Sequence, residues 1–279
     1  MRTRIIAFFC HYEWPIYVPT FKDIYFLMIA TALLMAPLIA KKKGLPFFRF
    51  YLLTAAISAM SLFGGFAYVL FENAFSTPAI LRLQNIFSAG VGSYGAYLSG
   101  ILGGFFLLKI LKIDVLAALD IFAPVAALVH AFGRFACFLR GCCFGKPSNV
   151  LWTIQFPAGS PAHHVHLSRN WIPEGDKFSV PVHPVQIYDM LFSLVLWMIL
   201  FRLATKKEHN GFLFFSYLIS FATFRFFMEF VRDDYRQVVC GLSLPQALSL
   251  LFIIFGLSGL KIRRPGLHGV ITSRKGVIP

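Results

Sequence analysis

Long apolar stretches alternate with short polar connections along the whole chain. Each stretch approaches the roughly 20 residues that a helix needs to cross the hydrocarbon core of a bilayer. Because lipid offers the backbone no hydrogen-bond partner, such stretches must be helical. They lie at residues 21–40, 51–71, 88–108, 115–132, 188–203, 212–230 and 244–260. The pattern predicts an all-α fold, a polytopic membrane protein with about seven transmembrane helices.

One polar connection is much longer than the others. It runs from residue 133 to residue 184, between the fourth and fifth apolar stretches, and contains several histidines, tryptophans and prolines. Connections longer than about 15 residues commonly carry function. We therefore expect a single transmembrane domain over residues 1–279. In it, residues 133–184 form a small extracytoplasmic head with active-site residues, and residues 261–279 form a basic cytoplasmic tail.

Lysine and arginine are concentrated after every second apolar stretch. The four groups are Lys41 to Lys43 with Arg49, Lys109 with Lys112, Arg202 with Lys206 and Lys207, and Lys261 with the basic residues after it. The positive-inside rule assigns these connections to the cytoplasm. The N-terminus and the head are then expected outside the membrane, and the C-terminus inside.

The composition favours a membrane protein and argues against other classes. The chain is 58% hydrophobic and 14% charged, whereas soluble domains carry about a quarter charged residues. Its formal net charge is +14, but most basic residues lie in short connections, where they orient helices and contact anionic membrane lipids. No nucleic-acid partner is therefore expected. The five cysteines lack paired CxxC spacing, so no disulfide framework is indicated.

The stretch from His130 to Lys146 concentrates chemically active side chains at the end of an apolar run. Arginine presents a planar fork of donors that suits phosphate, and charge beside a bilayer is costly enough to indicate function. We interpret the stretch as the floor of a lipid-headgroup site. The alternative is a loop whose arginines only extend to the membrane interface. The candidate residues of the lipid-headgroup site are Arg134, Arg140, Gly145 and the thiols Cys137, Cys142 and Cys143.

The start of the fifth apolar stretch also carries polar residues. His183, Gln186 and Asp189 follow one another at helical-turn spacing, and Tyr188 lies beside them. Residues three apart share a helix face, so the segment predicts a polar face near the interface. An ordinary helix start with polar caps, beginning at Pro184, is the alternative.

A third polar segment lies late in the sixth stretch. Glu229 comes four residues after Arg225 and three before Arg232, so the three can pair along one face. A structural ion-pair ladder is the alternative. The excess of arginine favours an anionic ligand.

The third apolar stretch is rich in small residues and contains Tyr94 and Tyr97. Gly92, Ala96 and Gly100 share a helix face, which by itself can serve only close helix packing. Taken with the other segments, however, the outer ends of the helices bring together arginines, a carboxylate, phenols, a histidine and thiols. Such a set suits a phospholipid headgroup, because arginines neutralise phosphate as charge develops on a leaving group.

These segments resemble the prolipoprotein diacylglyceryl transferase family over nearly the whole chain. The shared motifs are Gly133-Arg134 with Gly141 and Gly145, His183-Pro-x-Gln-x-Tyr188, Arg225-x-x-x-Glu229-Phe-x-Arg232 and Gly241-Leu-Ser-x-x-Gln246. The resemblance implies transfer of diacylglyceryl from phosphatidylglycerol to the thiol of a lipobox cysteine in a prolipoprotein. The reaction would take place at the outer face of the bacterial cytoplasmic membrane and release glycerol phosphate, with no metal or other cofactor.

The resemblance also implies roles for single residues. Arg134 would bind and position the lipid phosphate, Arg225 and Glu229 would act at the reacting headgroup, and Arg232 and Gln186 would support them. We expect Arg140, His183, Tyr188 and Gly145 to complete the lipid site. Tyr94 stands where the family has a histidine, and becomes the candidate base. Cys137 stands where the family prefers asparagine, and Arg140-Gly-Cys142 where it prefers Asn-Gly-Glu.

These departures leave three alternatives open. The chain could transfer a lipid moiety to another acceptor, with Cys142 or Cys143 as a covalent nucleophile. It could bind or transport phospholipid without catalysis. The cysteines could also hold a metal ion together with His163, His164, His166 or His183, although their spacing matches no common zinc pattern.

Overall fold

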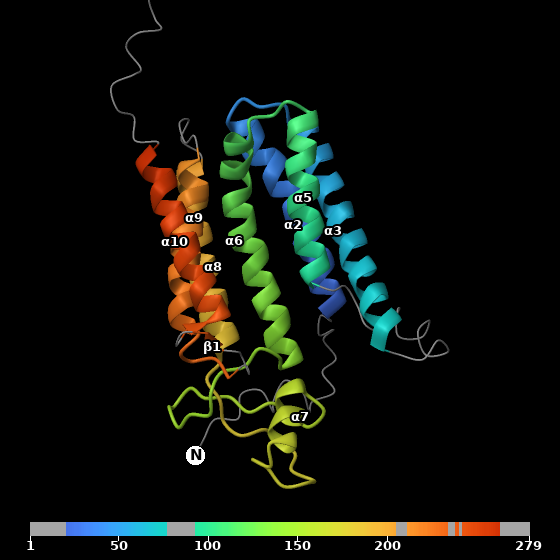
Figure 1. The fold of residues 1–279 in the computed structure, drawn as a ribbon, viewed down its shortest axis with the longest axis vertical. Coiled ribbons are helices and arrows are strands. Elements are labelled where there is room, and N and C mark those ends of the chain that lie inside the picture. The colour runs from blue at the N-terminus through green and yellow to red at the C-terminus, as the bar shows by residue number, and fades with distance from the viewer. Residues whose placement is uncertain (1–20, 77–92, 205–210, 234–237, 240–241, 263–279) are drawn as a thin grey trace, which may run out of the picture.

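The computed structural model describes residues 21–76, 93–204, 211–233, 238–239 and 242–262. Within these residues, long helices form one bundle and a small folded head lies at one end of it (Figure 1). The long helices are α2 (Phe21–Lys42), α3 (Phe47–Ser76), α5 (Ser93–Ile110), α6 (Val115–Arg140), α8 (Val185–Ala204), α9 (Phe212–Met228) and α10 (Leu244–Ile262).

The apolar stretches predicted as helices are helical over their described residues, except that the helix in the sixth stretch ends at Met228, two residues before its predicted end. Five helices are long and apolar enough to cross a membrane, and Gly95–Ile110 and Phe212–Met228 are shorter apolar helices. The expectation of an all-α, polytopic membrane protein is therefore confirmed, and the number of spans stays a prediction. The first residues of the predicted third stretch, 88–92, lie outside the described residues.

Helix α6 occupies the middle of the bundle and packs against α2, α8 and α9, while α3 packs against α5 and α2, and α10 against α9. Its buried positions include Ala118, Ala123, Ala127 and Ala131. Small side chains let neighbouring helices approach closely. The hydrophobic core accordingly lies around α6, between α2, α3 and α8.

Both ends of α6 are capped. The Asp114 carboxylate accepts hydrogen bonds from the backbone N–H groups of Leu116 and Ala117. At the other end Gly141 takes the left-handed conformation with φ of 74°, which glycine adopts without steric cost. The helix therefore continues eight residues beyond the predicted end at residue 132. Arg134 lies on its last turns, and the head starts at residue 141 rather than 133.

The head comprises residues 141–184 and contains the short helix α7 (Pro161–Ser168). Isolated antiparallel bridges join its loops, and a small hydrophobic cluster forms its centre. Phe144, Ile154, Phe156, Ala162 and Val182 make up that cluster. The head lies at the end of the bundle where α6 and α9 finish and α8 and α10 begin (Figure 1). A short antiparallel pair, β1 (Val238–Val239) with β2 (Leu242–Ser243), leads into α10.

Basic residues gather at the opposite end of the bundle. The last turns of α2, α5, α8 and α10 carry Lys41 and Lys42, Lys109, Arg202 and Lys261, and these turns lie away from the head (Figure 1). The charge asymmetry expected along the sequence thus becomes an asymmetry between the two ends of the bundle.

Candidate active site

A buried ion pair joins the end of α6 to the start of α8. The Nε of Arg134 lies 3.2 Å from Oδ2 of Asp189, whose side chain is only 2% exposed. The same Nε donates to Nε2 of His130, one turn earlier on α6, at 3.1 Å. Because this imidazole nitrogen accepts a hydrogen bond, it carries no proton in this arrangement.

Asp189 also lies close to a second arginine. Arg232, which follows α9, is buried, and its Nη1 is 3.8 Å from Oδ2 of Asp189. The Arg232 backbone forms an isolated bridge with Gly145 of the head. Asp189 is therefore a shared carboxylate between two guanidinium groups that come from different parts of the chain.

The predicted pair on α9 is present and is tied to α10. Nη1 of Arg225 lies 2.9 Å from Oε2 of Glu229, and Oε1 of Glu229 accepts from the Ser243 hydroxyl at 3.1 Å. The Ser243 N–H donates to Gln246 Oε1, and the Gln246 N–H donates back to the Ser243 hydroxyl. This is a capping box with glutamine at its third helical position. The Ser-x-x-Gln motif thus starts α10 and presents its serine to Glu229.

Among the residues that the structure describes, the cluster has more positive than negative groups. Three guanidinium groups, of Arg134, Arg225 and Arg232, face the two carboxylates of Asp189 and Glu229, and all three arginines act electrostatically on both Asp189 and His130. Ionised side chains that are largely buried need opposite charge nearby. The remaining positive charge suits an anionic ligand.

Other predicted residues surround this cluster at the base of the head. The Gln186 side-chain amide donates to the Cys142 carbonyl at 2.7 Å. Its Oε1 is buried and has no hydrogen-bond partner among the described residues, which leaves an acceptor for a ligand. The Tyr188 hydroxyl accepts from the Trp152 indole at 2.6 Å and lies 3.3 Å from Nδ1 of His183.

Gly145 lies where the head touches the start of α8. A Cβ atom at this position would come within 2.6 Å of a Val185 methyl and 2.7 Å of both the His183 Cβ and the His183 carbonyl. The Gly145 N–H donates to that carbonyl at 3.1 Å. Glycine is therefore required here for backbone contact, and the same residue forms the isolated bridge with Arg232.

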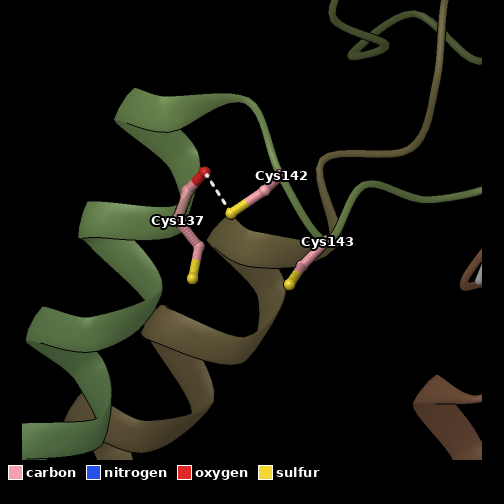
Figure 2. Close-up of side chains that lie close together, drawn as sticks. All are labelled: Cys137, Cys142 and Cys143. Carbon is pink, nitrogen blue, oxygen red and sulfur yellow. Dashed lines mark hydrogen bonds between the residues drawn. The ribbon is translucent and has the colours of Figure 1, made fainter. Parts of the chain in front are cut away.

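Three cysteines converge where α6 passes into the head (Figure 2). The sulfur atoms of Cys137, Cys142 and Cys143 all lie within 4.8 Å of one another and are free thiols. The neighbouring Cys137 and Cys142 thiols lower the pKa of Cys143, and the charges of Arg232 and Arg134 lower it further. The pKa of Cys142 is raised, because the neighbouring Cys137 and Cys143 thiols and its partial burial favour the protonated form.

Two predicted residues are not placed in this cluster. Arg140 is exposed at the end of α6, and the side chain of Tyr94 lies outside the described part of the chain.

The head histidines do not join the cysteines, because the described metal-ligating cluster contains the three thiols alone. His163 bonds to the Asp176 carbonyl, and His166 is buried between Phe144 and Trp171. Burial lowers the pKa of His166. The alternative of a metal site shared by these cysteines and the histidines is therefore wrong for the described residues.

The structure adds His130 and Asp189 to the candidate site. Asp189 was expected on the polar face of the fifth stretch, but neither residue was among the expected site residues. The available signal was spacing, because His130 lies four residues before Arg134 and therefore on the same helix face.

Comparison with known proteins agrees with the motifs. A family profile described as prolipoprotein diacylglyceryl transferase matches residues 15–262. The phosphatidylglycerol–prolipoprotein diacylglyceryl transferase of Clostridium tetani is 35% identical over 196 residues, which covers 69% of this chain and 71% of that protein. Proteins of the same name are 28% identical in Geobacter sulfurreducens, over 77% of this chain and 75% of theirs, and in Trichormus variabilis, over 90% of each.

Proposed function

The chain belongs to the prolipoprotein diacylglyceryl transferase family, and we propose that it transfers a diacylglyceryl group from phosphatidylglycerol to the thiol of a prolipoprotein lipobox cysteine. The observation that carries the proposal is the cluster of three largely buried arginines around Asp189 and Glu229. It lies at the head end of an apolar bundle, where a phospholipid phosphate could be reached from the bilayer.

The cluster suits the bond changes of this reaction. The thiolate of the acceptor forms a bond to the glyceryl carbon, while the bond from that carbon to the phosphate oxygen breaks. Glycerol phosphate leaves with the electron pair, so negative charge grows on its phosphate. Preorganised cations at that position stabilise the transition state more than the ground state. Arg134 and Arg232 are held for this task by Asp189, and Arg225 by Glu229.

The surrounding residues receive supporting roles. Gln186 offers its buried Oε1 to a hydroxyl of the headgroup. His183 and Tyr188, whose side chains contact each other, complete the lipid site below the head. Gly145 keeps the head close to α8. Arg140 is an exposed contact for anionic lipid heads, and Tyr94 remains the candidate base of the third apolar stretch.

The same proposal orients the chain in a bacterial cytoplasmic membrane. With seven spans, the basic ends of α2, α5, α8 and α10 lie in the cytoplasm, as does the tail at residues 261–279. The head then faces outward, where the N-terminus also lies. The whole chain acts as one domain, because the arginine cluster is built from α6, α8 and α9 together with the head.

The test is transfer from acyl-labelled phosphatidylglycerol to a lipobox peptide in membranes that contain the chain. Wild type should modify the peptide cysteine, and a peptide with serine at that position should stay unmodified. Arg134→Ala should reduce the rate by a factor on the order of 10² or more. Arg169→Ala is the matched control, since Arg169 of the head pairs with Asp233 and its side chain is 28% exposed. Undiminished transfer by Arg134→Ala, or folded wild type that modifies no peptide, would contradict the proposal.

A further inference from the structure

The end of α6 brings two cysteines together through its backbone. The Cys142 N–H donates to the Cys137 carbonyl, and the Gly141 N–H donates to the Phe138 carbonyl, both at 3.1 Å. With Gly141 in the left-handed conformation, this is a Schellman motif. The motif places the side chains of its two outer residues in contact, and in this chain both are cysteines. The Cys142 thiol also bonds to the Cys137 carbonyl (Figure 2).

The third cysteine joins them through an unusual backbone conformation. Cys143 has a φ of 58°, a region that non-glycine residues occupy at a cost of about 1–2 kcal/mol. In this conformation its sulfur lies within 4.8 Å of those of Cys137 and Cys142. The Gln186 amide holds this turn through the Cys142 carbonyl. A strained conformation that is held by its surroundings commonly marks a functional site.

The resulting group of atoms has the chemistry of a metal site. Three sulfurs that share a tetrahedral zinc ion lie roughly 3.8 Å apart, given Zn–S bonds of about 2.3 Å. The observed group lies within 4.8 Å, so side-chain rotation can close it. Thiolates select soft or borderline ions. Arg134 and Arg232 lie near enough to Cys143 to act on its charge, and they can offset the negative charge of a tris-thiolate complex.

We propose that Cys137, Cys142 and Cys143 bind a thiophilic metal ion such as Zn²⁺, and that its fourth position takes the acceptor cysteine. Three protein ligands with one open position are the arrangement of catalytic rather than structural zinc sites. The second half of this inference rests on the proposed function. Apart from Tyr94, whose side chain lies outside the described residues, the candidates for a base are occupied: His130 Nε2 accepts from Arg134, and Asp189 and Glu229 pair with arginines.

The step is balanced as follows. A thiol that coordinates zinc gives up its proton, here to water. The metal-bound thiolate is the nucleophile, and its electron pair forms the C–S bond to the glyceryl carbon. The C–O bond breaks, and glycerol phosphate departs between Arg134 and Arg232. Nothing is oxidised or reduced, and the metal keeps its three protein ligands.

The binding test uses the full chain with Cys10→Ser and Cys240→Ser, so that the three clustered thiols are the only ones present. Metal-free protein is titrated with Zn²⁺, and with Co²⁺ as a visible probe. The expected result is one ion per chain, protection of all three thiols from alkylation, and loss of both in Cys143→Ser. Binding without such stoichiometry, binding that survives Cys143→Ser, or a disulfide among the three sulfurs in protein taken directly from membranes would overturn the site.

The second measurement separates this inference from the proposed function. Addition of a lipobox peptide should change the Co²⁺ spectrum, whereas the peptide with serine in place of cysteine should not. Removal of the metal should lower transfer at least tenfold, and Zn²⁺ should restore it. Full transfer by metal-free protein would overturn the role of the ion. A chain that binds the ion and the cysteine peptide, yet transfers nothing in any state, would keep the metal site and refute the transferase function.

Discussion

The shared carboxylate of Asp189 gives a sharp test of what stabilises the head end of the bundle. Asp189→Asn keeps the size of the side chain and removes its charge. Oδ2 of Asp189 lies 3.2 Å from Arg134 and 3.8 Å from Arg232, and the carboxylate is 2% exposed. Removal of one partner from a buried ion pair costs about 3–5 kcal/mol, because the remaining charge stays buried without compensation. We expect the free energy of unfolding to fall by that amount.

A matched control is the pair Arg169–Asp233, which joins the head to the segment after α9. This pair is shorter, at 2.7 Å, but its side chains are 28% and 17% exposed. In a uniform medium the shorter pair would be the stronger one. Exposure to water reverses the order, because pairs near the surface contribute about 0.2–1 kcal/mol. Asp233→Asn should therefore lower the free energy of unfolding by less than about 1 kcal/mol.

The two variants can be compared by reversible unfolding in mixed micelles, with increasing fractions of a denaturing detergent and tryptophan fluorescence as the signal. A double-mutant cycle of Asp189→Asn with Arg134→Gln isolates the pair from other effects of each change. The reasoning is refuted if Asp233→Asn costs as much as Asp189→Asn. It also fails if the cycle gives no coupling between Asp189 and Arg134.

Three further changes test other parts of the structure. Gly145→Ala should destabilise the chain by about 1–3 kcal/mol through overpacking, whereas Gly133→Ala, whose nearest neighbour is a Met28 methyl at 3.6 Å, should be neutral or stabilising in the same unfolding assay. Asp120→Ala should lower the free energy of unfolding by about 1–3 kcal/mol and speed hydrogen exchange in the first turn of α9, because this carboxylate accepts two backbone N–H groups there at 2.7 and 2.9 Å. Burial lowers the pKa of His166 in the folded head, so as the pH falls the unfolded head binds the proton at a higher pH than the folded head does. The stability of the head should therefore be full above about pH 6.5 and fall as the pH drops toward the folded-state pKa. His166→Phe should remove this dependence, as followed by Trp171 fluorescence.

The helices could be predicted from the sequence because their signal is simple. Each apolar stretch must be buried in the bundle or face lipid along its length. The helix is the conformation that satisfies the hydrogen-bonding groups of its backbone there. The predicted end of α6, at residue 132, is wrong because a charged residue was taken to end the apolar helix. Arg134 looked like the start of a polar loop, but Asp189 and His130 supply its partners from inside the bundle. A charge with such partners does not end a helix.

The arrangement of the site could be predicted only in part. The pair Arg225–Glu229 follows from helical spacing, and the structure contains it. The contact of Asp189 with Arg232 depends on how α8 and α9 pack and on the turn after α9, and no local pattern encodes that. The cysteine cluster depends on the left-handed conformation of Cys143, which residue preferences disfavour and which only the surrounding head can impose.

Gly141 shows how one backbone position connects these features. Its left-handed conformation ends α6 directly after the turns that carry Arg134, and it starts the turn that carries Cys142 and Cys143. A Cβ atom at Gly141 would lie 2.8 Å from the Phe156 ring, so the glycine also lets the head cluster approach the helix. The arginine, the thiols and the head core are therefore positioned by the same turn. Side chains that must act together gain by being fixed from one point, because errors in their relative position then do not accumulate through separate elements.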